Sequence, residues 1–421
     1  MTRLELDWSA WDGPLAVVRR LRKHGHEAWL AGGCVRDLLL GTAPKDYDIA
    51  TSAEPAQVME IFTGAVALKP ELGVVLVPKG QPIEVTSFRS EGPYLDGRRP
   101  SWVERTTAIG DVQRRDFTIN GMLLDAETGE VIDHVGGMED LRAGLLRCIR
   151  DPRERFLEDH LRLLRAVRFS TRLGFAIDPD TWKAVCELSG EVVTLSGERL
   201  HEELGRMFSQ GPFLPCLRLL RESGILAALF PELDAALSEP LVRDRMERLF
   251  GEVWPEEVPW FVGFGLALCP WMAQSTFAER SALFPQAEGL LDRLRASNHE
   301  KDAARLVWTR FPELFAPGQK LSQKASLVRE RHYPALVGLL ACWEERIAST
   351  GLREAWQDAC KRVASAQKPP VGHVWMAADP RVKGARVGEA MRLADAILLD
   401  QGPCDSEVLV KQVLGTMFGD G

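Results

Sequence analysis

The sequence of 421 residues has no run of 18 or more apolar residues, and its first residues lack a basic region followed by an apolar core. The first absence argues against a membrane-spanning helix and the second against a secretion signal, so we expect a cytoplasmic protein without a membrane partner. The eight cysteines are scattered, with no Cys-x-x-Cys pair. They predict buried thiols rather than a disulfide framework or a zinc site.

Two further features limit the function. No Gly-x-x-x-x-Gly-Lys-Ser/Thr sequence occurs, so an ATPase with that phosphate loop is not expected. The formal net charge of −8 argues against a general nucleic-acid-binding protein. Residues 150–172 are nevertheless locally basic, with seven arginines against four acidic residues. Because local potential governs contact with phosphates, this segment is a candidate for binding RNA.

The clearest chemical signal lies near the N-terminus. Gly32 and Gly33 stand between an apolar run and a helical run, and glycines let backbone N–H groups approach a phosphate closely. Asp46 and Asp48 fall in a segment, 46–50, that is predicted to be a strand, so their side chains should share one face. Two adjacent carboxylates repel each other unless a cation lies between them, and Mg²⁺ prefers such ligands together with phosphate oxygens. The pattern therefore predicts nucleotidyl or phosphoryl transfer.

This segment resembles the first motif of the tRNA nucleotidyltransferase and bacterial poly(A) polymerase family, within the DNA polymerase beta nucleotidyltransferase superfamily. Further segments resemble later motifs of the family, in the family's order: 88–100, 114–121, 136–141, 158–169 and, more weakly, 196–204. A lone Gly-Gly or Asp-x-Asp would be weak evidence, whereas several ordered segments with characteristic spacings are a strong signal. The resemblance covers roughly the first half of the chain.

The resemblance implies an α/β nucleotidyltransferase head with a mixed sheet, followed by an all-α neck, body and tail. We expect the catalytic head at 1–150, the neck with a base-reading template at 151–210, the body at 211–300 and a tRNA-binding tail at 301–421. The residue pattern agrees, because helical and strand patterns alternate in the head and the strand signals stop after Pro152.

Local patterns predict several elements of the head. The expected helices lie at 14–24, 35–40 and 55–62, the last with Ser52 as its start signal. Short β-rich runs at 74–77 and 83–88 could pair, and the last strands are expected at 130–135 and 145–149. Residues 90–105, rich in Gly, Pro and paired arginines, predict a mobile loop.

In the mechanism that the resemblance implies, two Mg²⁺ ions bridge the nucleoside triphosphate and the RNA 3′-hydroxyl. Asp46 and Asp48 are the expected ligands and catalytic residues. Glu84 could supply a third carboxylate from a neighbouring strand, and an outward-facing strand residue is an equally good interpretation. Arg36 could donate to triphosphate oxygens, the alternative being a surface arginine paired with Asp37 or Asp46.

The resemblance also places residues around the sugar. Arg115 and Asp116 would face the ribose and its 2′-hydroxyl, and Arg114 or Asn120 would hold that turn in shape. The sequence leaves open which of the two arginines points to the nucleotide.

Asp159 and Arg162 form the most discriminating pair. Three residues apart on an expected helix, they would share one face, and the bland interpretation is a surface salt bridge. As a template, the carboxylate would accept from an exocyclic amine and the guanidinium would donate to a ring nitrogen. Cytosine and adenine match this order, and uracil and guanine present the reverse. Arg165 and Arg168 continue along the helix, and the resemblance favours contact with the nucleotide.

The predicted loop bears on the product. In relatives that add C, C and A, a flexible loop of this kind is needed for the switch from C to A, and this chain keeps Tyr94, Asp96, Gly97, Arg98 and Arg99. The loop therefore favours full CCA addition, but an A-adding or poly(A) enzyme could use it as well.

The sequence thus predicts an RNA nucleotidyltransferase that builds the tRNA CCA end from CTP and ATP. An A-adding enzyme or poly(A) polymerase of the same family is the nearest alternative. A nucleotidyltransferase for small molecules would not need the basic neck and long helical tail. A catalytically inactive RNA-binding module is disfavoured because the acidic and basic candidates are all present.

Overall fold

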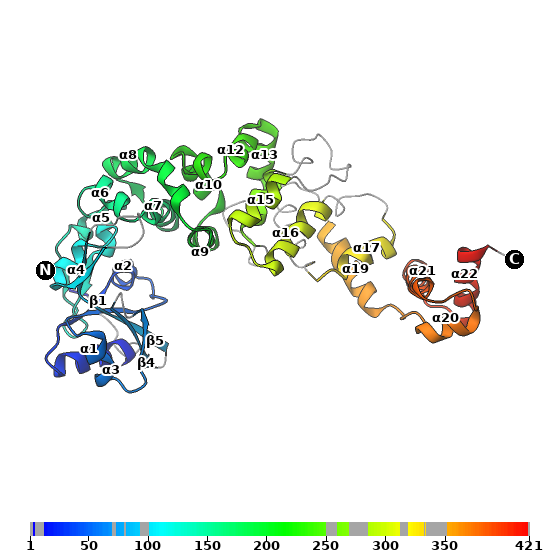
Figure 1. Ribbon diagram of the computed structural model, residues 1–421, viewed down its shortest axis with the longest axis horizontal. Coiled ribbons are helices and arrows are strands. Elements are labelled where there is room, and N and C mark those ends of the chain that lie inside the picture. Colours follow the sequence, from blue (N-terminus) through cyan, green and yellow to red (C-terminus); the bar gives the residue numbers. More distant parts are fainter. Residues whose placement is uncertain are drawn as a thin grey trace. The chain divides into compact units, whose positions relative to one another are not determined.

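The computed structural model describes residues 3–4, 12–69, 73–79, 81–92, 101–249, 259–268, 285–311, 319–331, 333 and 352–419 (Figure 1). The chain forms two compact units, Met1–Pro231 and Glu232–Gly421. None of the helices in the described ranges combines the length and the hydropathy that crossing a membrane requires. The six cysteines among these residues are free.

The first unit begins with a mixed sheet, in which seven strands are described in the order β3-β4-β5-β2-β1-β8-β9. The neighbours are antiparallel except β2 and β5, which are parallel. The strands are β1 (Ala28–Ala31), β2 (Asp48–Thr51), β3 (Val66–Lys69), β4 (Val74–Lys79), β5 (Gln81–Ser87), β8 (Met122–Leu124) and β9 (Val131–Asp133). The mixed sheet and the predicted pairing of β4 with β5 are confirmed.

The helices of the head are α1 (Asp12–Lys23), α2 (Gly33–Leu39), α3 (Pro55–Ile61), α4 (Ala108–Gln113) and α5 (Gly137–Ala143), with a 3-10 helix, η3 (Thr118–Asn120). The start predicted for α3 is wrong. The helix is preceded by Glu54, whose backbone N–H donates to Gln57 Oε1 at 2.8 Å. Ser52 is engaged elsewhere, since its Oγ accepts the Glu27 N–H at 2.9 Å beside strand β1.

The predicted loop at 90–105 has paired strands at its base. β6 (Arg89–Glu91) and β7 (Val103–Arg105) form an antiparallel ribbon, which corrects the loop prediction at both ends. Residues 93–100 lie outside the described residues, and with them Tyr94, Asp96, Gly97, Arg98 and Arg99.

Helices predominate in the rest of the first unit. They are α6 (Pro152–Glu158), α7 (Leu161–Leu173), α8 (Pro179–Glu187), η4 (Ser189–Thr194), α9 (Gly197–Gln210), α10 (Phe213–Glu222) and α11 (Ile225–Leu229). The strand expected at 145–149 is present as the shorter β10 (Leu145–Leu146). The expectation that no strand follows Pro152 is wrong, because β11 (Ala176–Ile177) pairs with β10 in parallel. Gly174 ends α7 with φ of 68°, a left-handed conformation that suits glycine, and the chain then returns to β10.

The described part of the second unit is helical. Its helices are α13 (Pro240–Leu249), α14 (Phe261–Ala267), α15 (Pro285–Arg293), α16 (Asn298–Arg310), α17 (Leu321–Val328), α19 (Leu352–Ser365), α20 (Gly372–Ala378), α21 (Ala385–Gln401) and α22 (Ser406–Phe418), while α12 (Pro231–Ser238) begins at the division. Trp308, Trp356 and Trp375 of this unit are buried. The division at Pro231 falls within the segment predicted to be the body, and the four-part domain division stays a prediction.

Candidate active site

A cavity of about 500 Å³ in the first unit gathers most of the predicted site residues. Its walls come from α2 and the loop before it, from the segment that leads into β2, and from the turn after α4 with η3. Asp159, helix α7 and the end of α9 complete the walls. The predicted residues that line it are Gly32, Gly33, Arg36, Asp46, Asp48, Arg114, Arg115, Asp116, Asn120, Asp159, Arg162, Arg165 and Arg168. Glu84 is not among the lining residues.

The acidic side of the cavity lies at the start of β2. This strand begins at Asp48, and Asp46 lies in a bend before it, so the prediction that both belong to one strand is wrong. The pairing of β2 with β1 and β5 includes no residue before Asp48. The backbone at Asp46 therefore does not follow the alternating geometry of a strand. Asp48 is half-buried and Asp46 exposed, yet both face the cavity.

Glu84 lies directly beside Asp48, as its register partner across the parallel β2–β5 pair, but it is exposed. Burial, together with repulsion from the charges of Glu84 and Asp46, raises the pKa of Asp48 to about 6. Such an excess of negative charge on oxygen ligands fits a hard divalent cation. In the described part of the chain, no group of three His, Cys, Asp or Glu side chains could hold a metal ion. Two carboxylates, Asp46 and Asp48, face the cavity, and this donor set fits Mg²⁺, which typically takes one or two carboxylates and completes its shell with water and phosphates.

Gly32 allows the Arg115 side chain to approach the backbone closely. Its φ of 77° is left-handed, and a Cβ placed there would lie 2.7 Å from Arg115 Nη1 and 3.7 Å from Asp48 Oδ2. Arg115 fills the space that the glycine leaves open, beside the acidic wall. Both Arg114 and Arg115 line the cavity, and the buried carboxylate of Asp111 binds both guanidiniums. Both side chains therefore reach the cavity, and which of them contacts the nucleotide stays a prediction.

Arg36 is not a surface arginine, and its guanidinium is bonded to protein groups although the residue lines the cavity. Its side chain is buried, with Nε and Nη2 donating to Asp37 Oδ1 at 2.8 and 2.6 Å and Nη1 donating to Asn120 Oδ1 at 2.6 Å. Asn120 Nδ2 donates in turn to Asp116 Oδ1 at 3.1 Å. Asn120 therefore connects the helix after the glycines to the 114–121 turn.

Asp116 is buried and fully bonded. Oδ1 accepts the Phe117 N–H and the Asn120 amide, and Oδ2 accepts Arg165 Nε at 2.8 Å and Nη2 at 2.6 Å. Burial alone would raise its pKa, but the Arg165 charge and these hydrogen bonds hold the pKa well below the usual range. The carboxylate consequently stays ionised and orients Arg165.

The ring of Phe169 lies among three guanidiniums. The Cζ atoms of Arg36, Arg165 and Arg168 are 5.3, 5.1 and 4.3 Å from its centroid, within reach of cation–π attraction. Arg168 is buried and its Nε donates to Glu203 Oε1 of α9 at 2.6 Å. The ring and the ion pair fix the directions of the arginines on this wall.

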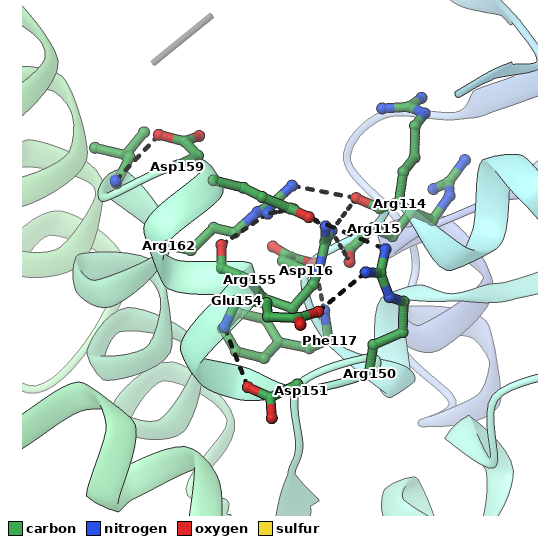
Figure 2. A network of polar contacts seen from close by, with 12 residues as sticks. Arg114, Arg115, Asp116, Phe117, Arg150, Asp151, Glu154, Arg155, Asp159 and Arg162 are labelled. Atoms are coloured by element: carbon green, nitrogen blue, oxygen red, sulfur yellow. Dashed lines mark hydrogen bonds and ion pairs between the residues drawn. The ribbon is translucent and has the colours of Figure 1, made fainter. Parts of the chain in front are cut away.

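The structure corrects the prediction that Asp159 and Arg162 share one helix. α6 ends at Glu158, α7 begins at Leu161, and Asp159 between them is extended with φ of −144° (Figure 2). Asp159 Oδ1 accepts the Leu161 N–H at 3.1 Å, which favours the break before α7. The two side chains do not pair. Asp159 accepts Arg199 Nη2 at 2.9 Å, whereas Arg162 Nη1 donates to Glu158 at 2.7 Å.

Sequence reasoning missed the residues that hold the lining side chains in place: Asp111, Arg155, Phe169, Arg199 and Glu203. The signal available for Glu203 was a charged residue on the buried face of a helix, where an unpaired charge is costly. No comparable local signal marks Arg155 or Arg199, because the Arg114 and Arg115 carbonyls that Arg155 binds, and the Asp159 carboxylate that Arg199 binds, lie about 40 residues away in the sequence.

Two segments of the chain match models of known protein families. Residues 28–147 match the family model described as poly A polymerase head domain, and residues 174–237 match the one described as probable RNA and SrmB-binding site of polymerase A. Over these segments the chain is similar to the tRNA nucleotidyltransferase and poly(A) polymerase family.

A curated relative, the CCA-adding enzyme of Geobacillus stearothermophilus, is 43% identical over 218 residues, which are 51% of this chain and 54% of the relative. The chain thus matches about half the length of such curated relatives. The fold matches over more of the chain. The structure of the Bacillus stearothermophilus CCA-adding enzyme in complex with CTP has a TM-score of 0.77 and 26% identity, with 97% of each chain covered. The Thermotoga maritima CCA-adding enzyme complexed with tRNA_CCA has a TM-score of 0.65 at 21% identity, covering 98% of this chain and 96% of that one.

Proposed function

We propose that this chain is a cytoplasmic, template-independent RNA nucleotidyltransferase that adds CCA to the 3′ end of tRNA from CTP and ATP and releases pyrophosphate. The observation that carries the proposal is one cavity with an acidic wall, Asp46 and Asp48, beside a wall of arginines and Asp159. The acidic wall suits nucleotidyl transfer, and the arginine wall suits a triphosphate and a base. The names of the relatives, CCA-adding enzymes with CTP or tRNA bound, support the same substrates.

Asp46 and Asp48 would hold Mg²⁺, with Glu84 beside Asp48 adding negative charge from the next strand. When bound there, the metal would supply the acidity that deprotonates the RNA 3′-hydroxyl and would neutralise charge on the leaving pyrophosphate. Arg115, held over Gly32 by Asp111, would donate to phosphate oxygens from the side next to Asp48. Arg36 would act by fixing the loop and Asn120, because its guanidinium is bonded to Asp37 and Asn120.

The opposite wall would read the base. Asp159 would accept a hydrogen bond from the exocyclic amine that cytosine and adenine share, and Arg162 would donate to the adjacent ring nitrogen. Uracil and guanine would leave both groups badly paired, a cost of about 1–3 kcal/mol for each buried group. Since the two side chains come from either side of a helix break, each can be oriented by its own partners, Arg199 and Glu158.

Asp116 acts differently in this proposal from the sequence-based expectation. All four of its lone-pair directions are taken by protein donors, so it would orient Arg165 rather than accept from the ribose 2′-hydroxyl directly. Arg165 would then contact the nucleotide, while Arg168 is bound to Glu203 and supports the wall.

The test is the product formed on a tRNA that lacks its CCA end. The purified protein is incubated with that tRNA, Mg²⁺ and labelled CTP, ATP or both, and the products are sequenced. We expect two C residues followed by one A when both nucleotides are present. Incorporation of A alone on a tRNA ending in CC would indicate an A-adding enzyme, and a long A tract a poly(A) polymerase. No incorporation of either nucleotide would reject the proposal.

A further inference from the structure

Arg155 is a buried arginine that lies between the head and the base-reading wall without lining the cavity (Figure 2). It is 2% exposed and comes from α6, and its pKa is lowered to about 9 by burial and by the neighbouring charges of Arg162 and Arg150. At neutral pH it therefore remains a cation in an unfavourable place. Such a buried charge needs strong partners.

The partners of Arg155 are main-chain carbonyls of the 114–121 turn and one carboxylate. Nη2 donates to the carbonyl oxygens of Arg114 and Arg115, the latter at 2.6 Å, and Nη1 donates to Glu158 Oε2. Its Nε is buried and has no partner among the described residues. The planar guanidinium of Arg155 thus joins α6 to the backbone of Arg114 and Arg115, the two arginines of the head that line the cavity.

Arg162 uses two of the same acceptors. Its Nη1 donates to Glu158 Oε2 at 2.7 Å and to the Arg155 carbonyl at 2.9 Å, and its Nη2 donates to the Arg114 carbonyl at 3.2 Å. These contacts use three of the five N–H donors of a guanidinium, which leaves two for a ligand in the cavity that Arg162 lines.

The shared acceptors place the two arginines in competition. Without the Arg155 side chain, the Arg115 carbonyl would lose its donor and Glu158 would lose one of its three cationic partners, which are Arg150, Arg155 and Arg162. A buried acceptor left without a partner attracts the nearest donor, and Arg162 already reaches Arg114 and Glu158. Its guanidinium would turn further toward these groups and away from the cavity.

We propose that Arg155 is a positioning residue for nucleotide selection: it occupies the carbonyls of Arg114 and Arg115 and shares Glu158, so that Arg162 keeps two donors for the base. The inference rests on the proposed function, in which Arg162 reads the base. Arg155 itself would not touch the nucleotide.

The central variant is Arg155→Met, which keeps an apolar chain of similar reach but has no donor or charge. Arg155→Lys keeps the charge but cannot donate as a planar fork. The matched control is Arg153→Met on the same helix, because Arg153 is 60% exposed and pairs with Glu187 at the surface. The measurement is kcat/KM for CTP, ATP, UTP and GTP on one tRNA acceptor, with Tm recorded for every variant.

Arg155→Met should lower the preference for CTP over UTP by about tenfold, the effect of misplacing one hydrogen bond to a charged group. Arg155→Lys should recover most of the Tm but little of the preference, and Arg153→Met should change neither. In an Arg162→Met background, Arg155→Met should cause no further loss of preference, because its effect passes through Arg162. An equal fall for all four nucleotides, or full additivity of the two losses of preference, would overturn the inference.

Two provisions keep the result unambiguous. If Arg155→Met does not fold, Arg155→Lys carries the test, and an unchanged preference in a folded Arg155→Lys protein contradicts the inference. Equilibrium binding of CTP and UTP to wild type and variants, measured without tRNA, separates the two hypotheses. If the wild type adds neither C nor A, the proposed function is rejected. If the wild type adds both and Arg155→Lys keeps the binding preference for CTP over UTP, only the role of Arg155 is rejected.

Discussion

Arginines are held differently in the two units of this chain. In Met1–Pro231, Arg36, Arg155 and Arg168 are at most 4% exposed, and each bonds groups on other segments around one cavity. In Glu232–Gly421, Arg305 and Arg329 pair with Glu288 and Asp395 while 45% and 48% of their side-chain surface stays exposed. Exposed pairs contribute little to stability, whereas a buried charge must keep its partner. The comparison indicates that the buried ion pairs around the cavity set side-chain directions, whereas these two exposed pairs of the second unit add little to its stability.

The largest effect is expected at the acidic wall. Asp48→Asn should lower kcat for both C and A addition by about 10³-fold or more, since loss of a metal ligand removes several kcal/mol of transition-state stabilisation. Asp46→Asn should act in the same direction. Single-turnover assays at saturating Mg²⁺ measure this, with Asp180→Asn on the exposed start of α8 as the control. Near-normal turnover in Asp48→Asn would remove that residue from the metal site.

The buried pair of Arg168 and Glu203 tests the first half of the comparison. Glu203→Gln leaves a buried guanidinium without its anion and should cost about 3–5 kcal/mol in the free energy of unfolding. Glu202→Gln, the adjacent residue, is the control, because its pair with Arg206 lies at the surface. Urea unfolding measures both. Equal effects of the two substitutions would show that burial does not distinguish these pairs.

Substitutions at Asp159 and at its partner Arg199 test whether the orientation of the Asp159 carboxylate affects the selection of the base. Asp159→Ala should reduce kcat/KM for CTP and ATP by a factor corresponding to about 1–3 kcal/mol, and UTP and GTP should gain relative to them. Arg199→Met should shift the preference in the same direction but less, since it only orients the carboxylate. A uniform fall for all four nucleotides would mean that the base is read elsewhere.

The pH dependence of stability should reveal the cost of ionising Asp48 beside Glu84 and Asp46. Its pKa, about 6 in the folded protein against an ordinary 3.8, means that the folded state binds a proton more readily than the unfolded state between these values. The contribution of this group to stability therefore falls as pH rises through that window, and at pH 7 the ionised carboxylate costs about 3 kcal/mol without a cation. Asp48→Asn should be more stable than wild type at pH 7 without Mg²⁺, and the difference should vanish below pH 4. Urea unfolding at both values measures this, and a difference independent of pH would contradict it.

The smallest effect is expected in the second unit. Glu288→Gln, which breaks the exposed pair with Arg305, should change the free energy of unfolding by less than about 0.5 kcal/mol. Differential scanning calorimetry with and without roughly 0.5 M salt measures this effect. Salt at that concentration screens surface charges to a similar extent in all variants. A loss as large as that of Glu203→Gln would remove the contrast between the two units.

Much of the site could be predicted because its signals are local. Gly32 with Gly33 and Asp46 with Asp48 each lie within a few residues of one another, and alternation or helical spacing fixes the neighbouring elements. The mixed sheet of the head, the helices after it and thirteen of the twenty lining residues followed from such patterns and from the family resemblance.

The tertiary structure decided the directions of the side chains. Asp159 and Arg162 have a spacing that suits one helix face, but Asp159 breaks the helix and pairs with Arg199, 40 residues away. Arg36 suits a phosphate contact by sequence, but burial commits it to Asp37 and Asn120, 84 residues away. A buried charge takes whichever partner the fold brings near, because leaving it unpaired costs more than any local preference can offset, and a sequence does not show which partner that is.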